Sequence, residues 1–245
     1  KRIVFYRESQ FQFDLTFLKN IFVKFLHFLT LKFSSKILSN SNYAFYNFYK
    51  KKELNNKYHK VVRNGVYKKN SKIVYCREDI RKKYFIPKNS FVIGHIGRFT
   101  PAKNHKLLVD LAKQLCNTHD DIYFLLCGSN VSESINDDLI ECSIREKVIT
   151  PGLCKDVYSY LAAMDVFVFP SFNEGQPNTL IEAMISGIPI VASSIPSVKE
   201  TVPPNTNQVL FNPYDKGAFL KEILKIKSGE ISYNVDAVKT WSRKK

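Results

Sequence analysis

Two glutamates, Glu174 and Glu182, flank a turn between an apolar run and a helical pattern. A carboxylate can accept two hydroxyl hydrogen bonds at once, so either side chain could recognise a hydroxylated ligand. The apolar run at residues 166–169 has the length and the β-branched or aromatic character of a buried parallel strand. In an open parallel sheet, the turn after such a strand lies at the carboxyl end, where these folds bind ligands. The sequence therefore predicts a binding site at this turn.

The helical pattern after the turn adds the unpaired backbone amides of a helix start. Leu180, Ile181, Met184 and Ile185 fall on one side of that pattern, as in a helix that packs on a sheet. The first amides of the helix, and the positive end of its dipole, would point into the turn. A helix start of this kind is a ready site for phosphate. Hydroxyl acceptors and phosphate-binding amides are thus predicted at one place.

The two glutamates belong to a longer pattern. Seven residues separate Glu174 from Glu182, and Ala183 and the Ser-Gly-Ile-Pro turn at residues 186–189 follow. This pattern resembles the signature of retaining glycosyltransferases of family 4, which have the two-Rossmann-domain GT-B architecture. The resemblance implies an enzyme that moves a sugar, with retention, from a nucleoside-diphosphate donor. The plain alternative is that Glu182 is only a solvated residue on a helix face.

A basic turn earlier in the chain extends the resemblance. Residues 97–105, Gly-Arg-Phe-Thr-Pro-Ala-Lys-Asn-His, resemble the Gly-Arg-x-x-x-x-Lys-Asn-His segment of family 4 enzymes that build bacterial surface polysaccharides. By that resemblance, Arg98 and Lys103 bind the donor diphosphate and stabilise the leaving phosphate. Glu182 would bind the ribose hydroxyls, and Glu174 would lie by the hydroxyls of the donor sugar. The expected catalytic residues are therefore Glu174, Arg98 and Lys103. The alternative is that Arg98 and Lys103 are only structural cations on the surface of a loop.

Backbone groups complete the donor site that the resemblance implies. The amides of Asn178, Thr179 and Leu180 would cap the phosphate side. Gly152 and Leu153 match the family segment that borders the nucleotide base, although glycine is common at any strand-to-helix turn. The expected donor-binding residues are Gly97, Arg98, Lys103, Gly152, Leu153, Glu174, Gly175, Gln176, Pro177, Asn178, Thr179, Leu180 and Glu182.

Metal ligands are not grouped in the sequence. It has no Asp-x-Asp pair, no histidine with ligand spacing to another, and no Cys-x-x-Cys pair among its five cysteines. We therefore expect no metal and no cofactor, with cations stabilising the leaving phosphate. The odd number and wide spacing of the cysteines argue against a disulfide scaffold and favour a reducing cytoplasm. Cys116 and Cys127 lie in apolar patterns and are predicted to be core residues.

The elements that position these residues alternate between strand and helix from residue 91 onward. This alternation predicts an α/β fold, with helices on both faces of a parallel sheet. The strands are expected at residues 91–96, 122–126, 148–150, 166–169, 188–192 and 209–211. The helices are expected at residues 104–115, 132–144, 156–163 and 218–226, together with the helix after Glu174.

We expect the chain to hold a complete Rossmann-like donor domain and part of a second one. The predicted divisions are a partial N-terminal, acceptor-side domain at 1–66, a linker at 67–90, the nucleotide-sugar-binding domain at 91–228, and a C-terminal helix or tail at 229–245. The turn at residues 64–66, Asn-Gly-Val, resembles the turn through which family members reach their inter-domain hinge.

The N-terminal part looks short for the family. Four or more βα units precede the hinge in family members, whereas about two are visible here, so we expect the start of this domain to be missing. Residues 4–9 also lack the histidine that polysaccharide-type relatives often carry there. An alternative function therefore stays open, a non-catalytic remnant that binds a nucleotide sugar without transferring it.

The net charge of +15 in 245 residues requires an anionic partner or a strongly solvated surface. The lysines are spread along the chain, and no nucleic-acid-binding motif is present, so we expect no nucleic acid. The phosphates of a sugar nucleotide and an anionic membrane surface are the expected partners, with a glycan or lipid-linked acceptor. A Phe-rich helical pattern at residues 17–33 has lysines within it. It predicts either ordinary core packing or peripheral contact with the cytoplasmic leaflet.

Overall fold

The larger part of the computed structural model is a six-stranded parallel sheet with the strand order β6-β5-β4-β7-β8-β9. The structure describes residues 2–7, 17–49, 59–66, 76–204, 209–230 and 240. The strands of this sheet are β4 (Phe91–Ile96), β5 (Ile122–Cys127), β6 (Val148–Gly152), β7 (Val166–Phe169), β8 (Ile190–Ser193) and β9 (Leu210–Phe211). The order reverses between β4 and β7, as in doubly wound folds, and this confirms the predicted fold class.

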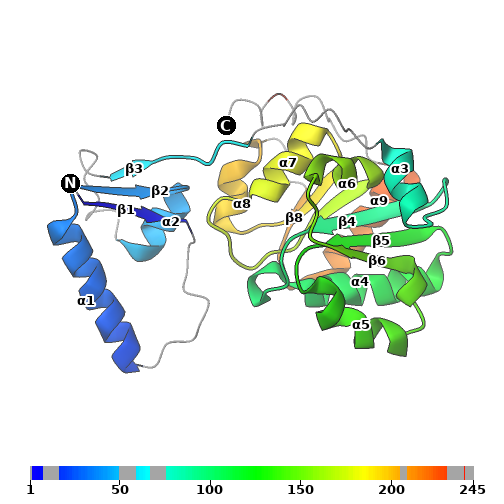
Figure 1. Cartoon of the computed structure of the whole chain (residues 1–245), viewed down its shortest axis with the longest axis horizontal. Coiled ribbons are helices and arrows are strands. Elements are labelled where there is room, and N and C mark those ends of the chain that lie inside the picture. Colours follow the sequence, from blue (N-terminus) through cyan, green and yellow to red (C-terminus); the bar gives the residue numbers. More distant parts are fainter. Residues whose placement is uncertain are drawn as a thin grey trace.

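Helices cover both faces of this sheet (Figure 1). One face carries α4 (His105–Thr118), α5 (Val131–Glu141) and α9 (Lys216–Ser228). The other carries α3 (Arg77–Lys83), α6 (Val157–Ala163), α7 (Asn178–Ser186) and α8 (Pro196–Thr201). Two short 3-10 turns, η2 (Pro101–Lys103) and η3 (Arg145–Lys147), precede α4 and β6. The sheet is therefore buried on both sides, which explains its nearly continuous apolar strands.

Alternation along β7 shows how its sequence builds both cores. Phe167 and Phe169 pack into the core under α6 and α7, whereas Val166 and Val168 pack into the core over α4 and α9. All four side chains are fully buried. Side chains that alternate along a strand point to opposite faces of the sheet, so one unbroken apolar run serves both layers. Cys116 and Cys127 are likewise buried, as predicted.

The N-terminal part is a three-stranded parallel sheet in the order β1-β2-β3 (Figure 1). Its strands are β1 (Ile3–Tyr6), β2 (Lys36–Ser39) and β3 (His59–Val61), and its helices are α1 (Phe17–Phe33) and α2 (Asn42–Phe48). A small core of Ile37, Phe45 and Tyr49 joins α2 to this sheet. The ends of β1 and β2 point toward the larger domain, which brings Arg7 and Asn40 to the junction.

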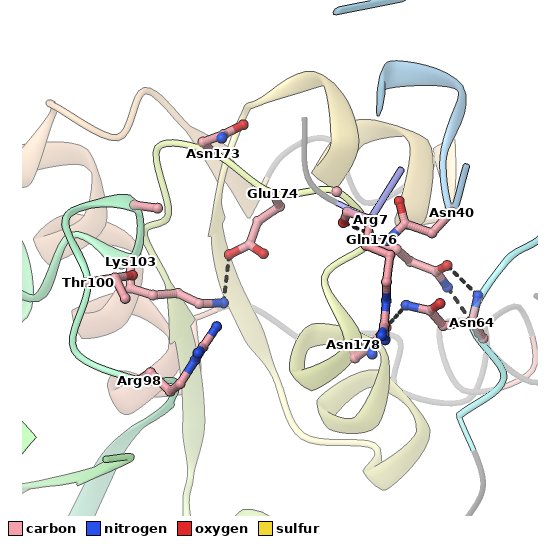
Figure 2. A pocket seen from close by; sticks show the side chains of 12 residues that line it. Arg7, Asn40, Asn64, Arg98, Thr100, Lys103, Asn173, Glu174, Gln176 and Asn178 are labelled. Atoms are coloured by element: carbon pink, nitrogen blue, oxygen red, sulfur yellow. Dashed lines mark hydrogen bonds and ion pairs between the residues drawn. The ribbon is translucent and has the colours of Figure 1, made fainter. Parts of the chain in front are cut away.

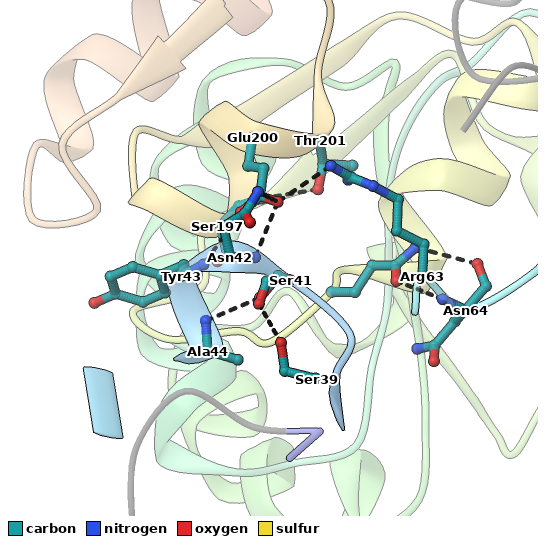
Figure 3. A network of polar contacts seen from close by, with 11 residues as sticks. Ser39, Ser41, Asn42, Tyr43, Ala44, Arg63, Asn64, Ser197, Glu200 and Thr201 are labelled. Atoms are coloured by element: carbon teal, nitrogen blue, oxygen red, sulfur yellow. Dashed lines mark hydrogen bonds and ion pairs between the residues drawn. The ribbon is translucent and has the colours of Figure 1, made fainter. Parts of the chain in front are cut away.

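The two parts meet at a carboxylate in α8 (Figure 3). Glu200 accepts hydrogen bonds from the Asn42 amide at 3.1 Å, the Asn42 side chain at 2.8 Å and the Tyr43 amide at 3.2 Å. The Arg63 guanidinium adds an ion pair at 3.2 Å. The two amides begin α2, and a helix start favours a negative charge. Glu200 thus holds the smaller part against the larger one from across the junction.

The predicted linker at 67–90 is wrong for its second half. Residues 67–75 lie outside the described residues, but α3 follows from Arg77 and its Ile80 belongs to the core of the larger domain. Arg81 is 4% exposed and donates to Asp165 at 2.7 Å. This ion pair, and the hydrogen bonds that Arg81 donates to backbone carbonyls, attach α3 to the larger domain, so the segment is not a solvated linker. The polar, lysine-rich composition concealed this helix.

Most predicted elements agree with the structure to within a few residues. The helix α8 was not expected, and β8 begins two residues later than the predicted strand at 188–192. The helix α1 is exposed along much of its length, with Phe22 60% and Phe25 53% accessible, so the core-packing prediction does not hold for these side chains. Within the described residues, no helix is long and apolar enough to cross a membrane. The predicted tail at 229–245 lies largely outside the described residues.

Candidate functional site

A cleft of about 400 Å³ lies where the loops after β4 and β7 leave the sheet (Figure 2). These are the strands beside the point where the strand order reverses, the usual ligand position in such sheets. The ends of β1 and β2 and the segment after β3 close its far side. The lining residues are Arg7, Asn40, Asn64, Arg98, Thr100, Ala102, Lys103, Asn173, Glu174, Gly175, Gln176 and Asn178.

The basic turn forms one wall of the cleft. Lys103 donates to Glu174 at 2.7 Å, and both side chains are largely buried. Arg98 is exposed and forms no ion pair within the part of the chain that the structure describes. Asn104, in the left-handed conformation (φ 55°), ties this turn to the loop after β7 by donating to the Pro170 carbonyl at 3.2 Å. Arg98, Lys103 and Glu174 thus lie on two loops, after β4 and β7, that are hydrogen-bonded to each other.

The start of α7 forms the adjoining wall. Its first helical residue, Asn178, lines the cleft, and the first amides of a helix have no partner inside it. Pro177 precedes the helix, so no side chain caps these amides. The wall can therefore donate several backbone hydrogen bonds to an anion, as predicted from the helical pattern.

Gln176 braces the cleft through its side chain. Its carboxamide accepts from the Asn64 amide at 2.6 Å and donates to the Asn64 carbonyl at 3.2 Å. The Asn64 side chain in turn donates to Asn178 at 3.2 Å. Both functional groups of Gln176 are thus used in holding the segment after β3. Its contribution to a ligand can come from its backbone.

Glu182 lies on α7, outside the lining of this cleft. Burial raises the pKa of its carboxyl to about 7, because desolvation disfavours the charged form. Its charge also contributes, after burial, to the raised pKa of Tyr158 on α6. Glu182 therefore lies near Tyr158, in the first turn of α6. Its carboxylate forms no side-chain hydrogen bond within the described residues and is available to a ligand.

Two histidines pack beneath the basic turn. Burial lowers the pKa of His105 to about 4, with a further contribution from the charge of Lys103. Burial likewise lowers the pKa of His95 well below its usual value. Both rings are neutral at physiological pH and pack edge to face, 5.1 Å apart. They support the turn by packing rather than by charge. Among the described residues, no three histidine, cysteine or acidic side chains are grouped to hold a metal ion.

The structure brings together about half of the predicted donor-binding residues. Those that line the cleft are Arg98, Lys103, Glu174, Gly175, Gln176 and Asn178. Those that do not line it are Gly97, Gly152, Leu153, Pro177, Thr179, Leu180 and Glu182. Leu180 is fully buried, so only its backbone could face a ligand, whereas Leu153 is 76% exposed.

Sequence reasoning missed the contribution of the N-terminal part. Arg7, Asn40 and Asn64 line the cleft but were not among the predicted site residues. Asn40 directly follows β2, at the carboxyl end of a parallel strand, and Arg7 directly follows β1. That position was the available signal, because the ends of parallel strands meet at one edge of a sheet.

The family is shown by comparison with known proteins. Residues 76–240 match the family model described as glycosyl transferases group 1. The chain belongs to this family. A galactosyltransferase of Escherichia coli, UDP-Gal:alpha-D-GlcNAc-diphosphoundecaprenol alpha-1,3-galactosyltransferase, is 26% identical over 178 residues, which cover 70% of this chain and 46% of that protein. The O-antigen biosynthesis glycosyltransferase WclY, also of Escherichia coli, is 27% identical over 49% of this chain and 33% of that protein.

Solved glycosyltransferases share the fold. The structure of HepE of Anabaena in complex with UDP-glucose matches with a TM-score of 0.78 and 18% identity, over 99% of this chain and 67% of that one. WaaG, a glycosyltransferase involved in lipopolysaccharide biosynthesis, matches with a TM-score of 0.72 and 15% identity, over 99% of this chain and 70% of that one. These likenesses confirm the GT-B architecture. The chain spans half or less of the length of the curated relatives named above.

Proposed function

We propose that this chain is the donor-binding and catalytic part of a retaining glycosyltransferase of family 4. It would transfer a sugar from a nucleoside-diphosphate sugar to a lipid-linked or surface-polysaccharide acceptor. The observation that carries this proposal is the gathering of Arg98, Lys103 and Glu174 with the start of α7 in one cleft. Two relatives support the class of acceptor, one named for O-antigen biosynthesis and the other for galactosyl transfer to a diphosphoundecaprenol-linked GlcNAc.

Different residues of the cleft would carry out the different steps of donor recognition and transfer. Arg98 and Lys103, together with the amides that begin α7, would bind the diphosphate and stabilise the charge that develops on the leaving phosphate. Glu174 would accept hydroxyl hydrogen bonds from the donor sugar. In the free protein, the ion pair with Lys103 holds the Glu174 side chain at this position. Glu182 would accept from the ribose at the neighbouring β6–α6 side.

Two further parts of the proposal concern the metal and the membrane. We propose that the cations act in place of a divalent metal. We also propose that α1 rests on the cytoplasmic leaflet, because it exposes apolar side chains such as Phe22 and Phe25 beside the exposed Lys24 and Lys32. Binding to anionic liposomes, with neutral liposomes as the control, tests that contact.

A panel of nucleotides and nucleotide sugars tests the main proposal. Melting temperature should rise with the correct nucleoside diphosphate, because a ligand that binds only the folded state stabilises it by mass action. Turnover with a lipid-linked acceptor should then persist in EDTA. Binding without acceptor-dependent release of nucleotide would favour the alternative of a non-catalytic nucleotide-sugar-binding protein. The proposal fails if UDP, GDP, ADP and CDP all leave the melting temperature unchanged.

A further inference from the structure

The cleft carries more positive charge than the predicted donor site requires. Among the residues that the structure describes, three cations, Arg7, Arg98 and Lys103, line it against the single carboxylate Glu174. Because Glu174 already pairs with Lys103 at 2.7 Å, the excess of two positive charges lies on the other groups. A partly enclosed surface of one sign concentrates ligands of the opposite sign. The ligand that suits this cleft therefore carries at least two negative charges.

Arg7 is the cation that comes from the N-terminal part. It directly follows β1, and its guanidinium forms no hydrogen bond or ion pair with any residue that the structure describes. Figure 2 shows its side chain on the side of the cleft that holds Asn178, across from Arg98 and Lys103. Asn178, the first residue of α7, thus lies on the same side of the cleft as Arg7. An anion at the helix start would have Arg7 beside it and Arg98 and Lys103 across the cleft.

The backbone of Arg7 is held in place from two directions. The Asn40 side chain, only 2% exposed, donates from its amide nitrogen to the Arg7 carbonyl at 2.8 Å. That carbonyl also lies directly against Gly175, where a side-chain Cβ would collide with it. Glycine at this position lets the loop after β7 approach the end of β1. A guanidinium that no described residue pairs with, on a fixed backbone in a cleft with excess positive charge, can bind an anionic group.

We propose that Arg7 is a third diphosphate-binding residue, contributed by the N-terminal part, and that Asn40 and Gly175 position it. This inference rests on the proposed function and deepens it. A guanidinium can form two parallel hydrogen bonds to one phosphate, a geometry that suits the donor diphosphate. The donor would then be gripped from both sides of the junction. Its binding would also draw the two parts together.

Calorimetry with the full 245-residue chain tests the assignment. Arg7→Ala should weaken UDP about tenfold or more, the loss expected for one charge-assisted hydrogen bond. Uridine, which lacks the diphosphate, should be unaffected. Arg7→Lys should recover part of the affinity, and Asn40→Ala should give a smaller loss. If the panel selects another base, the matching nucleoside diphosphate and nucleoside replace UDP and uridine.

Arg2→Ala is the matched control. Arg2 precedes β1 as Arg7 follows it, so the variant removes the same charge from the same strand at the end away from the cleft. The Arg2→Ala variant should bind UDP as the unchanged protein does. A second measurement is trypsin cleavage within residues 17–49, which UDP should slow in the unchanged protein but not in Arg7→Ala.

The outcomes separate this inference from the proposed function. If Arg98→Ala and Lys103→Ala lose affinity for the nucleoside diphosphate while Arg7→Ala does not, the inference is overturned and the proposed function stands. The inference is also overturned if Arg7→Ala changes only the KM for the acceptor, or if Arg2→Ala weakens UDP equally. If the unchanged protein binds no nucleoside diphosphate, both fall.

Discussion

Replacing Glu182 with glutamine should stabilise the folded protein relative to the unchanged chain, and this stabilisation should be larger at pH 8 than at pH 5. Burial raises the pKa of Glu182 from 4.5 to about 7 in the folded state. Below pH 4.5 the carboxyl is neutral whether the chain is folded or not. Between pH 4.5 and 7 the unfolded chain ionises first, so the folded state loses stability as the pH rises. Glutamine cannot ionise and escapes this loss.

The shift sets the expected magnitude. One pKa unit corresponds to about 1.4 kcal/mol, so the rise of the Glu182 pKa from 4.5 to about 7 gives an upper limit of about 3 kcal/mol. Because the side chain is partly exposed, solvent screening reduces this, and we expect about 1–2 kcal/mol at pH 8. Urea denaturation at pH 5, 6, 7 and 8 measures the difference. Glu141→Gln, at an exposed position on α5, controls for the loss of one carboxylate. A constant difference between Glu182→Gln and the unchanged protein from pH 5 to 8 would refute the reasoning.

The same substitution tests the ribose assignment. An ionised Glu182 is the stronger acceptor, because neither of its oxygens carries a proton, so the affinity of the unchanged protein for a sugar-free nucleoside diphosphate should rise between pH 6 and 8. Glu182→Gln should bind more weakly at pH 8 and lack this rise. If the variant is stabilised at high pH but binds the nucleotide normally, the carboxyl is buried as described yet does not contact the ribose.

Three other substitutions test the basic wall and the junction. Arg98→Ala and Lys103→Ala should each weaken the nucleoside diphosphate by about 1.5–3 kcal/mol in calorimetry, since each removes a charge-assisted bond; Lys106→Ala, on the exposed side of α4, is the control and should not. Glu200→Gln should speed proteolysis of the N-terminal part, because three donors of that part and the Arg63 ion pair depend on its carboxylate. An unchanged cleavage rate would show that this contact does not hold the two parts together.

Most of the larger domain could be predicted from the sequence because its strands are buried on both faces. A run such as residues 166–169, fully buried in the structure, requires apolar side chains at every position and stands out from its polar surroundings. The motifs around Glu174 and Lys103 follow such strands directly, so their meeting at the sheet edge follows from the topology. Helix α3 escaped this reasoning, since its anchor is a buried arginine, and arginine usually indicates a surface.

The missed part of the site has a different cause. Arg7 and Asn40 line the cleft because the ends of two strands in one sheet face the other sheet across a junction. The periodicity of a sequence does not predict which strand ends face each other across such a junction. Gly175 was placed in the site for its neighbours in the motif, yet its own constraint is the close approach of the Arg7 carbonyl. The family pattern thus locates the half of the cleft that the larger domain builds. The other half, to which Arg7 belongs, can be found only where both parts are seen together, and the behaviour of Arg7→Ala will show whether the proposed donor contacts both.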